Sequence, residues 1–249
     1  MSTPAGPAPF LLLSIRAEDA AADDEYAAMM RFAGLDANGL HRIRLTHRSL
    51  GQIDLTDWSG IILGGGPYNV SDSPADKSGD QRRAEADVLT LLNDVVARDF
   101  PFLGCCYGIG TLGVYIGATV DRTFAEPIGS VQVSLTPAGR SDPLFVDVPD
   151  AFEAFVGHKE AVSELPPGAV LLATSPACPV QAFRVGRNVY ATQFHPELDV
   201  AGICTRIEVY KDFGYFDPET VESLKESTRH SKVIYPPAIL RRFIDRFAA

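Results

Sequence analysis

Short apolar runs and longer amphipathic stretches take turns along the first half of the chain. Strands are predicted where apolar residues are continuous or alternate, at residues 10–16, 40–46, 60–67 and 101–105. Helices are predicted in the stretches between and after them, at residues 17–34, 84–97 and 107–118. Strands and helices that alternate at this spacing predict crossover units, and so an α/β fold whose mostly parallel central sheet has helices on both faces.

From about Ala118 onward the pattern changes to short strands with turn residues between them. These strands are predicted at residues 128–136, 169–175, 180–185 and 188–194. Their spacing favours a small antiparallel or mixed extension of the sheet. Two helices are predicted in the tail, at 218–229 and 237–247, and the second is amphipathic. We therefore expect a flexible leader at 1–9, one domain at 10–212, and a C-terminal helical extension at 213–249 packed on that domain.

Composition excludes several classes of partner. The 249 residues are 46% hydrophobic and carry a net charge of −10 with a pI of about 4.9, whereas nucleic-acid binders usually show a basic patch. The apolar run at 10–15 follows no basic segment and is too short to span a bilayer, so neither a signal peptide nor a membrane span is expected. Four cysteines without CxxC or zinc-like spacing predict no metal site and a reduced, cytoplasmic chain. A small molecule or another protein is the expected partner.

The segment LGCCYG (103–108) has the form of a nucleophile elbow, in which glycines two residues before and after a nucleophile permit a sharp strand-to-helix turn. Glycines 104 and 108 centre this turn on Cys106, since the same spacing around Cys105 would need glycine at Leu103 and Tyr107. The unpaired amides of a helix N-terminus favour the thiolate form at Cys106. Cys105 is then expected to be a buried packing residue, and the alternative is that both thiols only pack.

A nucleophilic thiol needs a base, and QFHPE (193–197) supplies one after a predicted strand. His195 is two residues from Glu197, so in extended backbone both side chains lie on one side. We expect His195 to take the thiol proton and return it to the leaving group, with Glu197 holding the imidazole. The other interpretation of His-Pro-Glu is an ordinary surface turn.

The segment GGGP (64–67) follows a predicted strand, which would bring it to the same sheet edge as Cys106. The backbone N–H groups of Gly66 and Tyr107 are the candidate oxyanion hole. A nucleotide cofactor is not expected, because no GxGxxG precedes a helix and no Lys-Ser/Thr follows the glycines.

Together, GGGP, LGCCYG and QFHPE resemble the class I, or triad-type, glutamine amidotransferase family, in its GMP-synthase-like branch. The likeness runs from about Phe10 to Ile207. It implies a flavodoxin-like fold, no metal or cofactor, and hydrolysis of the glutamine side-chain amide through a thioester on Cys106. The ammonia would go to a separate synthetase subunit, as the stand-alone branch implies.

The same resemblance implies substrate contacts near Gly65, Gly110 and His158. Loops like GHKE (157–160) help to hold the α-amino and α-carboxylate groups of glutamine in relatives. Many members carry glutamine where this chain has Gly110. The smaller residue would leave a wider pocket, so γ-glutamyl peptides or amides remain a second possible substrate class. A third alternative is a binding or regulatory module without activity. The sequence names no oligomeric state.

Overall fold

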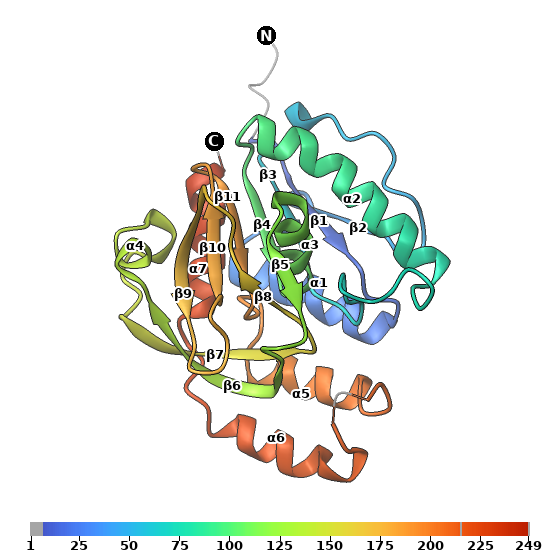
Figure 1. Ribbon diagram of the computed structural model, residues 1–249, viewed down its shortest axis with the longest axis vertical. Coiled ribbons are helices and arrows are strands. Elements are labelled where there is room, and N and C mark those ends of the chain that lie inside the picture. The colour runs from blue at the N-terminus through green and yellow to red at the C-terminus, as the bar shows by residue number, and fades with distance from the viewer. Residues whose placement is uncertain (1–6, 215, 249) are drawn as a thin grey trace.

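A nine-stranded sheet runs through the middle of the computed structural model, which describes residues 7–214 and 216–248 (Figure 1). Its strands lie in the order β2 (Leu40–Arg44), β1 (Phe10–Ser14), β3 (Gly60–Leu63), β4 (Phe102–Cys105), β11 (Val189–Thr192), β10 (Ala182–Val185), β9 (Ala169–Thr174), β6 (Glu126–Leu135) and β7 (Ala151–His158). Pairing is parallel from β2 to β11 and antiparallel from β11 to β7. A second, two-stranded sheet pairs β5 (Thr119–Asp121) with β8 (Ala161–Glu164).

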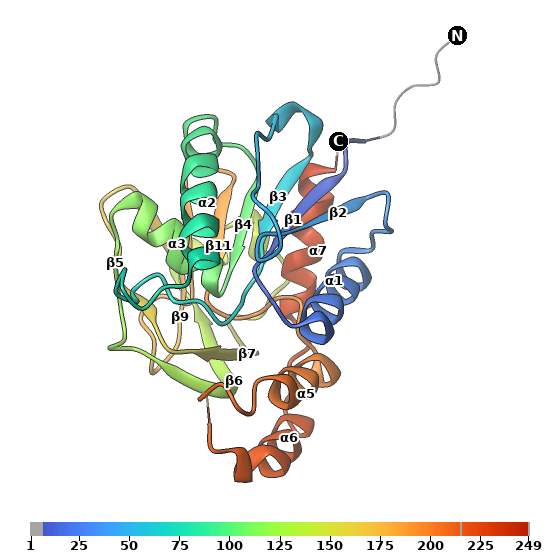
Figure 2. The same ribbon diagram turned by 90° about the vertical axis from the view of Figure 1, so that its right-hand side faces the viewer.

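Helices cover both faces of the parallel strands (Figure 2). One face carries α1 (Asp19–Ala33) and α7 (Pro236–Phe247), and the other carries α2 (Gly79–Ala97) and α3 (Tyr107–Ile116). Because side chains alternate along a strand, Leu12 packs in the first core while Leu11 and Leu13 pack in the second. Three helices lie outside these layers: α4 (Pro137–Arg140) beside β9, and α5 (Val200–Val209) with α6 (Val221–Arg229) at the β6–β7 end.

The predicted fold class is confirmed. The predicted and observed helices and strands differ in segments where the apolar periodicity of the sequence is weak. Helix α2 begins at Gly79, five residues before the predicted start, because the Ser78 side chain caps it by accepting from the Gln81 amide. The first turn of α2 is polar, so apolar spacing could not show it. The strands β5, β7 and β8 and the helix α5 were not predicted from the sequence.

The tail is in contact with the main sheet. Ile239, Leu240 and Phe243 of α7 are buried in the core beside β1, and the Phe243 and Phe10 rings lie 6.1 Å apart. The predicted tail helix at 218–229 starts as a short 3₁₀ turn at Pro218–Thr220 before α6. Of the predicted leader, residues 1–6 lie outside the described residues.

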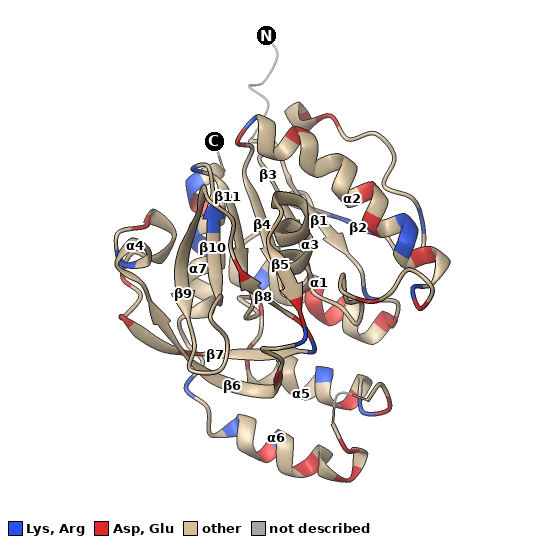
Figure 3. Cartoon of the chain, in the orientation of Figure 1, with Lys and Arg blue, Asp and Glu red and all other residues tan. Residues whose placement is uncertain are grey.

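Residues of both charge signs alternate along the helices α2 and α6 (Figure 3). In the described part of the chain, no helix combines the length and the apolar character needed to cross a bilayer. All four cysteines are free thiols.

Candidate active site

Cys106 lies in the turn that joins β4 to α3. Its backbone has φ 53° and ψ −95°, a conformation that is rare for residues other than glycine and costs about 1–3 kcal/mol. A Cβ atom at Gly104 would come within 2.7 Å of the Gly108 backbone. A Cβ atom at Gly108 would come within 2.8 Å of the Leu63 carbonyl oxygen. Both flanking positions therefore require glycine, as the elbow predicts.

The two neighbouring thiols have different surroundings. Cys105 is fully buried in the core on the α1 and α7 side. Burial raises the pKa of the Cys105 thiol well above its ordinary value, and the nearby charge of Glu197 raises it further. Cys106 is partly exposed and lines two cavities. Position alone therefore makes Cys106 the thiol that a substrate can reach.

His195 stands beside Cys106 because β11 is the parallel neighbour of β4, with Thr192 paired to Cys105. The imidazole Nδ1 lies 2.8 Å from Glu197 Oε1. A carboxylate can only accept, so Nδ1 carries the proton of this bond. The His195 ring also lies beside Cys106, because the position of a Cβ atom at Gly65 is 2.6 Å from His195 Cε1 and 3.2 Å from Cys106 Cβ. The candidate nucleophile, base and carboxylate thus lie side by side in the predicted order.

Charge in this site is set by burial and by its neighbours. Burial disfavours the cationic form of His195, but the nearby charges of Glu197 and Cys106, with the hydrogen bond to Glu197, raise the pKa of His195 to about 9. Burial also disfavours the anionic form of Glu197, yet His195 and two arginines hold the pKa of that carboxyl well below its usual range. At neutral pH His195 is therefore a cation that can donate a proton, and Glu197 is its counter-ion.

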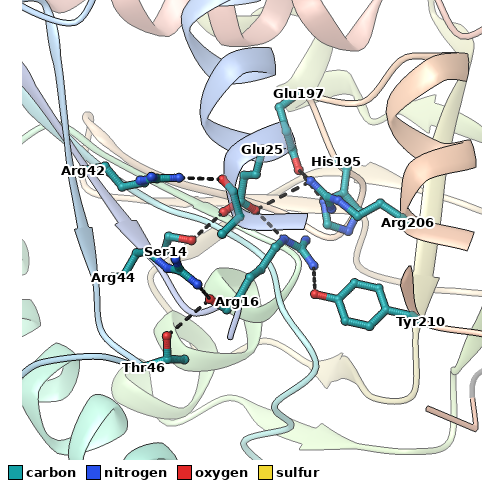
Figure 4. Close-up of polar contacts among 11 residues, drawn as sticks. Ser14, Arg16, Glu25, Arg42, Arg44, Thr46, His195, Glu197, Arg206 and Tyr210 are labelled. Carbon is teal, nitrogen blue, oxygen red and sulfur yellow. Dashed lines mark hydrogen bonds and ion pairs between the residues drawn. The ribbon is translucent and has the colours of Figure 1, made fainter. Parts of the chain in front are cut away.

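Glu197 is in contact with a buried array of alternating charges (Figure 4). Glu197 Oε1 accepts a second hydrogen bond from Arg206 Nη2 at 3.3 Å. The same Arg206 nitrogen lies 3.8 Å from Glu25 Oε1, which Arg16 Nε contacts at 2.9 Å. Ser14 donates to the other oxygen of Glu25 at 3.0 Å. All four charged side chains are at most 4% exposed, so their charges are compensated by one another and not by water.

Sequence reasoning missed Arg16, Glu25 and Arg206. One signal was available for Glu25, which lies on the buried face of α1 among Ala21, Ala22, Ala28 and Met29. A carboxylate at a core position needs a cation close by.

The glycine loop after β3 packs against Cys106 and His195. A Cβ atom at Gly65 would meet His195 Cε1 at 2.6 Å and Cys106 Cβ at 3.2 Å, so only glycine fits this position. Gly66 and Tyr107, the candidate oxyanion-hole residues, both line a cavity at Cys106. Tyr107 is the first residue of α3, where the helix itself provides no partner for the backbone N–H. The loop and the elbow thus meet at one sheet edge.

Cys106 separates two cavities. The base-side cavity is on the His195 side and is lined by Arg16, Gly66, Cys106, Ile128, Val156, Gly157, His195, Leu198, Ile203, Arg206 and Tyr210. The loop-side cavity is lined by Gly66, Tyr68, Asn69, Cys106, Tyr107, Gly110, Gly157, His158, Lys159, Glu160, Ala161 and Gln193.

The structure shows what surrounds two of the candidate substrate contacts. His158 lines the loop-side cavity, but its ring nitrogens lie 2.8 Å from the Glu160 carbonyl oxygen and 2.9 Å from Glu126 Oε2, so its side chain is occupied. Gly110 also lines the loop-side cavity, beside Glu160 and Val70. A Cβ atom there would meet Glu160 Oε1 at 3.1 Å and Val70 Cγ2 at 3.2 Å, because Glu160 fills this space.

One buried cluster away from Cys106 has the composition of a metal site. Ligand atoms of Glu126, His158 and Cys178 lie within 4.8 Å of one another. Hydrogen bonds from Ser175 and Gln181 already occupy the Glu126 carboxylate. Burial raises the pKa of the Cys178 thiol to about 12, which keeps it protonated at neutral pH. These features describe a hydrogen-bonded core cluster.

Comparison with known proteins relates the chain to enzymes that use glutamine. Residues 38–202 match the family described as glutamine amidotransferase class-I. The GMP synthase [glutamine-hydrolyzing] of Ruminiclostridium cellulolyticum is 33% identical over 151 residues, which are 60% of this chain and 26% of that protein. The protein of the same name from Neisseria meningitidis serogroup C is 28% identical over 150 residues, again 60% and 26%. The match thus spans about a quarter of the length of these relatives.

Solved structures share the fold. A glutamine amidotransferase from Thermotoga maritima superposes with a TM-score of 0.73 at 23% identity, covering 96% of this chain and 98% of its own. The glutamine amido transferase from Methylobacillus flagellatus has a TM-score of 0.66 at 19% identity, covering 98% and 93%. At these identities the likeness concerns the fold.

Proposed function

The chain belongs to the class-I glutamine amidotransferase family, and we propose that it hydrolyses the side-chain amide of glutamine with Cys106 as the nucleophile. The observation that carries the proposal is the strained elbow at Cys106, with His195 beside it on the wall of the same cavity and held by Glu197 2.8 Å away. A packing role for Cys106 would not need a costly backbone conformation that exposes its thiol. A reactive role accounts for both features.

The reaction proceeds in two halves. The Cys106 thiolate attacks the amide carbon, and the N–H groups of Gly66 and Tyr107 stabilise the oxyanion that forms. The C–N bond then breaks, and His195 gives its proton to the departing nitrogen, which leaves as ammonia. Water attacks the resulting γ-glutamyl thioester with His195 as base, releasing glutamate and restoring the thiol. Glu197 keeps the imidazole oriented and stabilises its cationic form throughout.

The loop-side cavity is the proposed site of the glutamyl part of the substrate. It contains Tyr107 of the oxyanion hole, with Gly110 and His158 on its wall, and Gly65 packs beside the nucleophile. Since the His158 ring is occupied, its contribution is through its place in the wall.

A second candidate function is hydrolysis of γ-glutamyl amides or peptides by the same residues. The base-side cavity favours it, because glutamine releases only ammonia and leaves that space unused. The chemistry at Cys106 is identical in both cases.

The test is incubation with glutamine and with γ-glutamyl peptides while ammonia, amine and glutamate are measured. Cys106→Ala should abolish activity, and Cys105→Ala is the matched control that should largely retain it. If Cys105→Ala were inactive and Cys106→Ala active, Cys105 and not Cys106 would be the nucleophile. No activity on either substrate, and no labelling by an electrophilic glutamine analogue, would favour a binding or regulatory module.

An ammonia-accepting synthetase subunit is the partner that accompanies the glutaminase proposal. The two matched relatives are named GMP synthases, and the match covers 26% of each. Support for a partner would be glutaminase activity that rises when a candidate synthetase and its other substrates are added.

A further inference from the structure

A buried arginine, Arg16, lines the base-side cavity. One nitrogen of its guanidinium group, Nη2, donates no hydrogen bond to any described residue. Arg16 is 3% exposed; its Nε donates to Glu25 at 2.9 Å and its Nη1 donates to Tyr210 at 3.0 Å (Figure 4). Arg16 Nη2 lies 3.1 Å from the point that a Cβ atom of Gly65 would occupy. The same point is 3.2 Å from Cys106 Cβ. The unused N–H groups of Nη2 are therefore close to the nucleophile, on the wall of a cavity.

The position of His195 decides which part of a substrate this cavity receives. The group that protonates the departing nitrogen must lie on the side of the leaving group. His195 lines the base-side cavity, whereas Tyr107 of the candidate oxyanion hole lines the loop-side cavity. The acyl part then extends toward the loop side, and whatever is attached to the scissile nitrogen extends toward Arg16.

The chemistry of the cavity wall limits what can bind there. Ile128, Val156, Leu198 and Ile203 make most of the wall apolar, which lowers the local dielectric constant and so strengthens a charge interaction. A guanidinium edge with free N–H groups is suited to a carboxylate. The cavity is about 40 Å³, room for about three water-sized groups, so the substituent must be short.

We infer that the base-side cavity is a leaving-group subsite in which Arg16 binds the carboxylate of an amino acid attached through its nitrogen to the γ-glutamyl group. The inference rests on the proposed function, in which Cys106 is the attacking group, His195 protonates the leaving nitrogen and Tyr107 contributes to the oxyanion hole. In the reaction the γ-amide C–N bond breaks, the amino acid leaves with a proton from His195, and water then releases glutamate from the thioester. A γ-glutamyl amino acid with a small side chain is the expected substrate class.

Binding to Cys106→Ala protein tests the subsite without turnover. Calorimetry would compare γ-glutamylglycine with γ-glutamylglycinamide, which differ only in replacing the carboxylate by an uncharged amide. We expect the acid to bind about tenfold or more tightly, as for a charge-assisted hydrogen bond in a site shielded from water. Equal affinities, or no binding of either ligand, would overturn the inference. This comparison leaves Arg16 unchanged and so does not depend on how a substitution there folds.

Adding Arg16→Gln to the Cys106→Ala protein identifies the group that recognises the carboxylate. The preference for the acid should fall to about twofold or less. The matched control is Lys159→Gln, which removes a cation from the wall of the loop-side cavity and should leave the preference unchanged. A preference that survives Arg16→Gln, or that depends on Lys159, would mean that the carboxylate binds elsewhere.

Turnover by the unaltered chain separates this inference from the proposed function. If the acid binds selectively but no glycine or glutamate is released, the hydrolase proposal fails and the subsite remains. If glutamine and both ligands are hydrolysed with equal kcat/KM and equal affinity, the hydrolase proposal holds and the subsite fails.

Discussion

Replacing Arg206 with glutamine tests whether the buried charge array holds the Glu197 carboxylate. Arg206 Nη2 lies 3.3 Å from Glu197 and 3.8 Å from Glu25, and all three side chains are almost fully buried. At an effective dielectric constant of about 20, unit charges 3.3 Å apart attract by about 5 kcal/mol. Part of this attraction is offset in the variant, because Arg206 no longer has to be desolvated.

Breaking a buried ion pair by removing one partner costs about 3–5 kcal/mol. In the variant, Glu25 still pairs with Arg16 and Glu197 still pairs with His195. We therefore expect the free energy of unfolding at pH 7 to fall by about 3 kcal/mol. In a chain of this size that corresponds to a fall in Tm of about 6–12 °C. Chemical and thermal unfolding of Arg206→Gln against the parent chain would measure both.

The pH dependence has a defined sign. The folded pKa of Glu197 lies below its unfolded value, so its ion pairing stabilises the fold above about pH 4.5 and this contribution is lost as the pH falls further. The difference in stability between parent and Arg206→Gln should therefore be full at pH 7 and shrink below about pH 4.5. Activity of the variant should also be lost at a higher pH on the acid side, since Glu197 would protonate more easily.

Arg31→Gln is the matched control, because Arg31 also contacts a carboxylate, Asp199 at 2.7 Å, but its side chain is 57% exposed. Exposed pairs contribute about 0–1 kcal/mol. If Arg206→Gln costs no more than Arg31→Gln and leaves the acid limb of the activity profile in place, the array does not support Glu197.

Two glycine substitutions test the elbow and the loop-side cavity. Gly108→Ala should lower the free energy of unfolding by about 3 kcal/mol or more, because its Cβ would lie 2.8 Å from the Leu63 carbonyl oxygen. Gly79→Ala is the control, since Gly79 lies in open space at the start of α2, and in the same thermal melts it should change stability by no more than about 0.5 kcal/mol. Gly110→Gln should reduce hydrolysis of every substrate at least about tenfold, since its side chain would displace Glu160 from the space beside Gly110. Faster glutamine hydrolysis by Gly110→Gln in a kinetic assay would instead favour the sequence-based interpretation of this position.

The parts of the site that the sequence predicted are those that depend on neighbours along the chain. Glycines two residues before and after Cys106 specify a turn in which only glycine avoids backbone contacts, and the turn was found at that position. His195 and Glu197 are two residues apart, so their pairing was also visible. Alternation of strands and helices predicted the parallel half of the sheet for the same local reason.

The antiparallel half was predicted less completely. Strands β7 and β8 lie on either side of a short turn in AFEAFVGHKEAVSE (151–164), a segment with a mixed apolar and polar pattern. The ten residues of α5 were also missed, because their apolar positions become a buried face only when β7 and α6 pack against them. Local periodicity is a weak predictor where tertiary packing supplies most of the stabilisation.

By itself, the sequence determined which thiol stands at the elbow, which histidine and carboxylate accompany it, and the family to which the chain belongs. Only the tertiary structure decided what surrounds them. Arg16 follows β1, Glu25 lies in α1 and Arg206 lies in α5, and they form one array because the fold buries all three at the same sheet edge. Likewise, Glu160 fills the space beside Gly110 from a distant loop. The spacing of residues along the chain fixes backbone geometry, whereas the energy of interaction between two charges depends on their distance in space and on the exclusion of water.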